Sequence, residues 1–186
     1  HFIDVEGDWA EMDDPRDLAH FVLGTKAQTL ERLSGVVKKS KILDQAIFKV
    51  EDWEKNQLLL IKTIQGSFPK RKIIIRSSAL NEDGFITANA GVYESVLNID
   101  SGDTKELKKA ISRVISSYTD TSKNNQVLVQ PMLENVKVSG VAFTRTLSHG
   151  APYYVLNYDD HSGSTESITS GSSTSHKTLI IRRDTL

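Results

Sequence analysis

The chain has 186 residues, 38% of them hydrophobic, which is enough to bury a core in one domain or in two small lobes. Its 23 basic and 24 acidic residues give a formal net charge of -1, so the basic character typical of nucleic-acid or anionic-membrane binding is absent. The lack of cysteine excludes disulfides, a thiolate nucleophile and cysteine-ligated metal sites. We expect any bound metal to have oxygen ligands.

Two features of the sequence bear on its location and its ends. It contains no run of about 18 apolar residues, and its start lacks the basic and apolar regions of a signal peptide. We therefore expect a soluble, cytoplasmic protein without a membrane partner; the sequence leaves its oligomeric state open. The first residue is His1 rather than Met, and the chain stops just after an apolar run that ends at Ile181. We expect a fragment of a longer protein.

The first elements follow from capping signals and apolar spacing. Gly24 and Thr25 precede apolar residues at helical spacing, with Gln28 three positions after the threonine, and this predicts a glycine turn that opens a helix. Residues 42–50 are predicted as a strand. Asp52 is the expected cap of a helix over residues 53–64, which Gly66 ends.

The next elements surround an arginine. Residues 73–75 are three isoleucines, which predicts a buried strand with Arg76 at its end, on the rim of a sheet. A strand is expected over residues 92–99. Asp103 opens a helix with a capping-box-like start and one apolar face. The expected face consists of Leu107, Ala110, Ile111, Val114 and Ile115.

The character of the chain changes from residue 126. Short apolar runs separated by turn residues predict an antiparallel sheet from four strands, at residues 127–132, 138–144, 152–158 and 178–181. The segment 159–176 is rich in Ser, Thr and Gly and is either a mobile lid or a loose connection. We expect an α/β (α+β) fold with two lobes, residues 1–100 and 101–186, and mixed or antiparallel sheets.

Two cations are candidates for an anion site. Lys26 lies in the first turn of a helix just after a glycine, where backbone N–H groups and a lysine together attract anions. An ordinary surface lysine is the alternative. Arg76 presents a planar fork suited to phosphate oxygens, or else it is a surface arginine paired with Glu82 or Asp83.

These residues fall within motifs that resemble one family. The string R-S-S-A-x-x-E-D from Arg76, and A-G-x-x-E-[ST]-x-L-N from Ala90, resemble the nucleotide-binding domain of the phosphoenolpyruvate synthase and pyruvate phosphate dikinase family, an ATP-grasp fold. Residues 127–133 and 138–144 are similar to the family's V-V-Q-x-M and S-G-V-x-F-T pair; a β-hairpin filling the core is the alternative. The likeness covers residues 23 to about 183, and the chain would be the front part of such a domain.

The resemblance implies a set of nucleotide contacts. It assigns ATP phosphates to Lys26, Arg76 and Ser95, close backbone approach to Gly91, and the adenine to two residues of the hinge, Gln130 and Met132. Because Pro131 lacks an N–H, a backbone donor to adenine would come from Met132 or beyond. Glu166 is the expected acid that closes over the nucleotide, or else a solvated loop residue.

The chain also departs from the family pattern. Thr25 replaces a glycine, Asn89 stands in a segment that is commonly Ser-Phe, Asn157 stands where an acid is usual, and Thr165 replaces another glycine. No Walker-type P-loop is present. The family's metal-ligand and phosphohistidine motifs are also absent, so we assign neither catalytic nor metal-ligating residues.

The implied function is that of the ATP-binding part of a phosphotransferase. With Mg²⁺, the full-length protein would pass a phosphoryl group from ATP to a histidine on another domain, while the isolated chain binds nucleotide without turnover. A non-catalytic nucleotide-binding or interaction module that has lost kinase activity is the alternative.

Overall fold

The structure is a computed structural model that describes residues 24–79, 93–165, 167–168 and 176–185. By residue contacts the chain divides into two units, His1–Met132 and Leu133–Leu186. Helix α5 and strand β4, which the expected division at residue 100 assigns to a second lobe, lie in the first unit because both pack with its sheet. Within the described residues, no helix combines the length and apolarity that crossing a bilayer requires.

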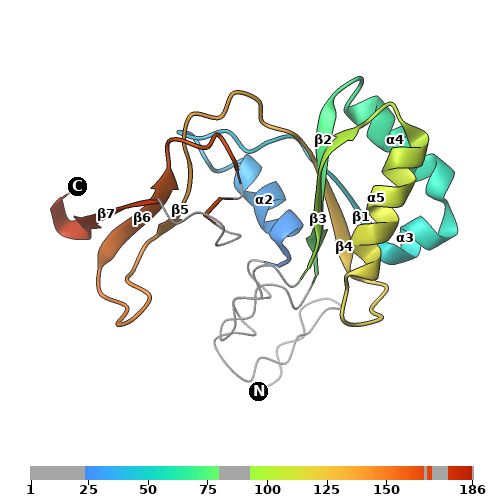
Figure 1. Cartoon of the computed structure of the whole chain (residues 1–186). Coiled ribbons are helices and arrows are strands. Elements are labelled where there is room, and N and C mark those ends of the chain that lie inside the picture. Colours follow the sequence, from blue (N-terminus) through green and yellow to red (C-terminus); the bar gives the residue numbers. More distant parts are fainter. Residues whose placement is uncertain (1–23, 80–92, 166, 169–175, 186) are drawn as a thin grey trace, which may run out of the picture. The chain divides into compact units, whose positions relative to one another are not determined.

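The first unit is a four-stranded antiparallel sheet with helices on both faces. Its strands, in spatial order, are β1 (Ala46–Lys49), β4 (Gln126–Pro131), β2 (Lys72–Ser78) and β3 (Ser95–Asp100). Its helices are α2 (Lys26–Ser34), α3 (Val50–Lys55), α4 (Gln57–Ser67) and α5 (Thr104–Ser116). Figure 1 shows α3, α4 and α5 on one side of this sheet and α2 on the other.

The apolar core lies between the sheet and the three helices α3 to α5. Ile73 and Ile75 of β2 are fully buried there against Leu107 and Ile111 of α5, together with Phe68 after α4. The capped helix expected after Asp103 is confirmed, since the Asp103 carboxylate accepts the N–H groups of Lys105 and Glu106. An amphipathic helix covers this face because its apolar stripe repeats at helical spacing.

The expected helix over residues 53–64 is wrong in its bounds. The structure has two helices, α3 and α4, separated at Asn56, whose backbone leaves the helical region at φ −154° and ψ 76°. The Asn56 side chain accepts a hydrogen bond from the N–H of Leu59 at 3.1 Å and so caps the second helix. Asp52 lies inside α3, where its carboxylate accepts the N–H of Lys49. An asparagine that satisfies a free helical N–H starts a new helix more readily than it continues one.

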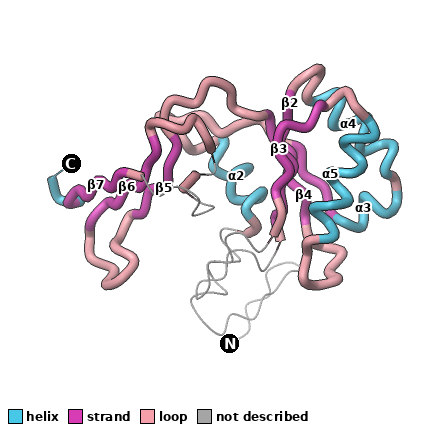
Figure 2. The backbone as a smooth tube through the Cα atoms, in the orientation of Figure 1, coloured by secondary structure: helices cyan, strands magenta, loops and turns pink. Residues whose placement is uncertain are grey.

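The second unit is built of strands. It contains the antiparallel sheet β5 (Ser139–Phe143), β6 (Tyr153–Asp159) and β7 (Lys177–Arg182), followed by the short 3₁₀ helix η1 (Arg183–Thr185). Figure 2 shows the contrast between this unit and the helix-bearing first unit. Gly140 permits the close approach of β5 and β6, because a Cβ at that position would collide with the backbone oxygen of Asn157.

The antiparallel sheet predicted for the second half is confirmed for three of its four strands. The run at residues 127–132 is the exception, since β4 pairs with β1 and β2 in the other sheet. The alternative of a hairpin between that run and residues 138–144 is wrong as well, because β5 pairs with β6. The α+β class with antiparallel sheets is as expected.

Candidate functional site

The two faces of the four-stranded sheet are distinguished by side-chain alternation. Ile73 and Ile75 belong to the core under α3 to α5, so Ile74, Arg76 and Ser78 project from the opposite face. The Ser78 hydroxyl accepts a buried hydrogen bond from the N–H of Ala27 in α2 at 3.0 Å. The face that carries Arg76 is therefore the face that carries α2.

Two of the predicted phosphate residues are direct neighbours in this sheet. Arg76 of β2 and Ser95 of β3 are register partners in the antiparallel ladder. Residues directly opposite in such a ladder project from the same face. The structure thus brings together a guanidinium and a hydroxyl that lie 19 positions apart in the sequence, and both residues are half-buried.

Arg76 does not lie where the isoleucine run predicts. The strand continues two residues beyond it, to Ser78, so Arg76 is inside β2 between Leu128 of β4 and Ser95 of β3 rather than at the rim. The Nε atom of its guanidinium is buried without a hydrogen-bond partner among the described residues. Glu82 and Asp83, its alternative partners from the sequence, lie outside the described part of the chain.

Lys26 is the first residue of α2. Its two neighbours in the chain, Thr25 and Ala27, form hydrogen bonds with β4 and with the segment before β1. Thr25 caps the helix in a capping box with Gln28, as expected, and its hydroxyl also donates to the Gln126 side chain of β4 at 2.7 Å. The Ala27 carbonyl accepts a hydrogen bond from Gln45 at 3.0 Å. These contacts hold the N-terminus of α2, where helical N–H groups favour anions, against the face of Arg76.

The two residues before this helix have different backbone conformations: left-handed at Gly24 and extended at Thr25. Gly24 has a φ of +71°, a left-handed conformation that favours glycine, and a Cβ there would press against the Gln28 side chain. Thr25 has a φ of −69°, which any residue adopts. The replacement of the family's second glycine by Thr25 therefore leaves the loop intact and adds a helix cap.

The two predicted adenine residues lie at the end of β4: Gln130 is inside the strand and Met132 follows it. Val127 and Val129 belong to the core, so Gln130 projects from the other face, with Leu128, toward the side of α2. The N–H of Met132 donates to the carbonyl of Lys72 at 2.9 Å. A backbone contact between Met132 and adenine would consequently use the Met132 carbonyl rather than its N–H.

Two predicted site residues are not among the residues that the structure describes. Gly91 and Glu166 are both outside the described residues, as is Asn89. Among the residues that are described, no group of three or more His, Asp or Glu side chains is arranged to hold a metal ion. Of the predicted site residues, Arg76, Ser95 and Gln130 therefore share one face of the sheet, and Lys26 lies in the helix that packs on that face.

Asp159, rather than Asn157, occupies the position of the acid in the family pattern that ends at Gly171. In the family spacing E-x-x-x-G-L-G-E, the position four residues before Gly163 is Asp159, not Asn157. Asp159 ends β6 and is buried. The Ser162 hydroxyl and the N–H groups of Ser162 and His161 donate to its carboxylate and hold the pKa of Asp159 well below its usual range. This acid orders the turn after β6.

Asp159→Asn should destabilise the second unit at neutral pH, and the difference from the parent protein should shrink in acid. A folded-state pKa below the unfolded value stabilises the fold above about pH 4, and this stabilisation is lost as the pH falls toward the folded-state pKa. Amide hydrogen exchange of β6 at pH 7 and pH 3 measures the effect. Asp184→Asn, which removes an exposed ion pair with Arg182, is the control with little expected change. Equal exchange at pH 7 would contradict the assigned role.

Comparison with known proteins identifies a family but no individual curated relative. No individual curated protein matches the chain. Residues 25–185 match the family described as "Pyruvate phosphate dikinase, AMP/ATP-binding domain", a nucleotide-binding domain of ATP-grasp-like fold. The match covers nearly the whole chain. It includes the motifs that begin at Arg76 and Ala90 and those at residues 127–144. The chain belongs to the pyruvate phosphate dikinase AMP/ATP-binding domain family.

Proposed function

We propose that this chain binds ATP on the α2-bearing face of its four-stranded sheet and serves as the nucleotide-binding part of a dikinase-type phosphotransferase. The single observation that carries the proposal is the pairing of Arg76 with Ser95, on the face to which the N-terminus of α2 and Lys26 are tied. The buried Nε of this guanidinium has no hydrogen-bond partner among the described residues, which supports a role in holding anionic oxygen.

The proposed contacts follow the chemistry of each group. Lys26 and Arg76 neutralise the phosphates, Ser95 donates a hydroxyl to them, and Gln130 with the Met132 carbonyl holds the adenine. Close backbone approach at Gly91 and closure by Glu166 are part of the same proposal. They are supported by the family match.

The acceptor of the phosphoryl group is proposed to be a histidine on another domain of the full-length protein. Phosphoryl transfer requires a divalent cation to neutralise charge between the phosphates, and Mg²⁺ is the cation we propose there. The described residues do not provide a metal-ligand cluster, so no step is assigned to this ion. The isolated chain is expected to bind ATP without turnover. We propose a cytoplasmic location, because a cysteine-free sequence suits a reducing compartment.

Lys26→Ala should weaken ATP binding by about tenfold and leave AMP binding nearly unchanged. In the proposed complex the removed charge would contact the distal phosphates, which AMP lacks, and one charge-assisted contact is worth about 1.5 kcal/mol. Calorimetric titration with ATP and AMP measures both affinities.

Lys105→Ala is the matched control, because Lys105 also lies in the first turn of a helix but on α5, across the sheet. A parallel loss of ATP and AMP binding in Lys26→Ala would argue against phosphate contact. If millimolar ATP fails to bind the folded parent protein, the proposed function is wrong.

A further inference from the structure

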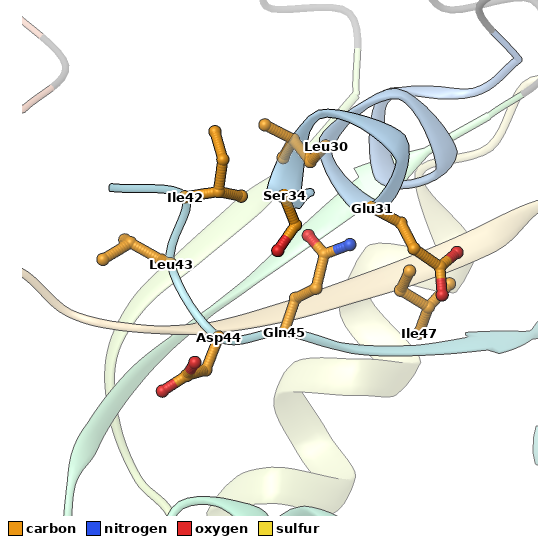
Figure 3. Close-up of a pocket in the computed structure, with 8 residues that line it drawn as sticks. All are labelled: Leu30, Glu31, Ser34, Ile42, Leu43, Asp44, Gln45 and Ile47. Atoms are coloured by element: carbon orange, nitrogen blue, oxygen red, sulfur yellow. The ribbon is translucent and has the colours of Figure 1, made fainter. Parts of the chain in front are cut away.

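Helix α2 has little apolar burial to hold it on the sheet. Of its nine residues, only Ala27 is buried. Its C-terminal half, with Leu30 and Ser34, borders a cavity of about 450 Å³ whose other side is the segment before β1 (Figure 3). Most helices in proteins are fixed by the packing of an apolar face, so the position of this helix depends strongly on its polar contacts.

Side chains from the sheet side take both polar groups of the Ala27 residue. The Ser78 hydroxyl of β2 accepts the Ala27 N–H at 3.0 Å, and Nε2 of Gln45, just before β1, donates to the Ala27 carbonyl at 3.0 Å. Figure 3 shows the Gln45 amide projecting toward α2. Ser78 and Ala27 are both 0% exposed, so water does not replace the bond between them.

A further contact fixes the residue on the other side of Lys26. The Thr25 hydroxyl donates to Oε1 of Gln126 in β4 at 2.7 Å. Gln126 and Ser78 are register partners in the ladder between β4 and β2, so their side chains project from the same face of the sheet. This pair contacts the first turn of α2 at the residue before Lys26 and at the residue after it.

The strand that carries Ser78 also carries the arginine proposed to bind phosphate. Arg76 and Ser78 are two positions apart in β2, which places them on one face at a separation of roughly 7 Å. Because Ser78 also holds the residue next to Lys26, its hydroxyl helps to set the distance between the lysine and the arginine. Two charged groups bind one triphosphate together only when their spacing is correct.

We propose that Ser78 and Gln126 are positioning residues of the phosphate site, which act through Lys26 by fixing the first turn of α2 relative to Arg76. Neither side chain contacts the nucleotide in this proposal. The inference rests on the proposed ATP-binding function and adds the residues that set the spacing of its two cations.

The test is a double-mutant cycle between Ser78→Ala and Lys26→Ala, with the affinities for ATP and AMP measured by calorimetric titration. Ser78→Ala should weaken ATP binding about fivefold and AMP binding by no more than about twofold, because the lysine it positions serves the distal phosphates. In the Lys26→Ala background, Ser78→Ala should cause no further loss of ATP affinity, since the group through which it acts is gone.

Gln126→Met tests the second contact of the pair. It removes the acceptor of the Thr25 hydroxyl and keeps a side chain of similar length. It should show the same pattern as Ser78→Ala, with a loss for ATP that disappears in the Lys26→Ala background. Gln126 is half-buried, so this variant provides the same test if Ser78→Ala fails to fold.

Ser101→Ala is the matched control. Ser101 is also 0% exposed, and its hydroxyl also accepts a backbone N–H, that of Arg71, at 3.1 Å. Arg71 precedes β2 at the end of the strand opposite Ser78. Ser101→Ala should lower Tm as Ser78→Ala does and leave the affinity for ATP unchanged.

The outcomes distinguish this inference from the proposed function. If Ser78→Ala leaves ATP binding unchanged, weakens ATP and AMP equally, or costs as much ATP affinity without Lys26 as with it, the serine serves only the fold. The inference is then overturned while ATP binding stands. Failure of the folded parent protein to bind ATP overturns the proposed function and this inference together.

Discussion

Arg76→Met should reduce the thermal stabilisation of the protein by ATP to a small fraction of the parent value. For the parent protein, ATP at 100 times its Kd adds about 2.7 kcal/mol to the free energy of unfolding. For a chain of this size, that is a rise in Tm of roughly 5–10 °C. The variant loses a forked donor to phosphate, worth about 3 kcal/mol, and its Kd for ATP should rise about 100-fold. Differential scanning fluorimetry across an ATP series measures the shift.

The same substitution should leave the nucleotide-free protein at least as stable. The Nε atom of Arg76 is buried without a partner among the described residues, and replacing an unsatisfied polar group by an apolar one removes its desolvation cost. Methionine is unbranched and fills the space beside Leu128, its register partner in β4. Loss of ligand response combined with unchanged or higher Tm is the pattern of a residue kept for binding.

Arg113→Met is the control for this experiment. Arg113 is an exposed arginine on α5, paired with Glu94, and exposed pairs contribute little to stability. It should retain the full ATP shift. A retained shift in Arg76→Met, or a large loss of Tm without nucleotide, would show that the guanidinium serves the fold.

Ile111→Ala should lower the free energy of unfolding by about 3 kcal/mol, the typical cost of truncating a fully buried aliphatic side chain. Ile111 is 0% exposed and lies in the core between α5 and the sheet. The expected decrease in Tm is roughly 6–12 °C. Urea unfolding followed by tryptophan fluorescence measures it, since Trp53 belongs to the same core.

Ile115→Ala on the same helix is the matched comparison. Ile115 packs at the edge of this core and is only partly buried, so its truncation should cost clearly less. Because α5 covers the face of the sheet away from the proposed site, Ile111→Ala should keep the parent affinity for ATP while it remains folded. Equal losses for the two variants would contradict the position of the core.

Local features of the fold were predictable where a signal involves only neighbouring residues. The capping box at Thr25 and Gln28 and the cap at Asp103 are examples, because each joins atoms within three positions of one another. The same kind of local signal is present at Asn56, whose side chain caps a second helix and so divides the expected single helix.

Pairing between distant segments was less predictable. Both β4 and β5 read as short apolar strands, and their closeness in sequence favoured one sheet, yet β4 lies between β1 and β2. Central strands of this kind are chosen by the burial of both faces, which alternation within one strand does not specify. The end of β2 was misplaced for a related reason, since Ser77 and Ser78 are polar but have buried partners in neighbouring elements.

In the candidate site too, local motifs were predictable and contacts between distant segments were not. The motifs by themselves named Lys26, Arg76, Ser95 and Gln130, because residue type and spacing within a short string are properties of the sequence. The hydrogen bond between the Ala27 N–H and the Ser78 hydroxyl carried no such signal, because its two residues lie 51 positions apart in the sequence and meet only where α2 packs on β2.

The sequence alone determined the family, the mixed α+β class and the chemical type of the candidate residues, since these depend on composition and local order. Tertiary structure decided which residues share a face. The register of β2 with β3 set Arg76 opposite Ser95, and the hydrogen bond of Ala27 to Ser78 attached the helix of Lys26 to that same face. The physical reason is that strand pairing and helix packing are selected by burial of the whole core, to which residues far apart in the chain contribute jointly.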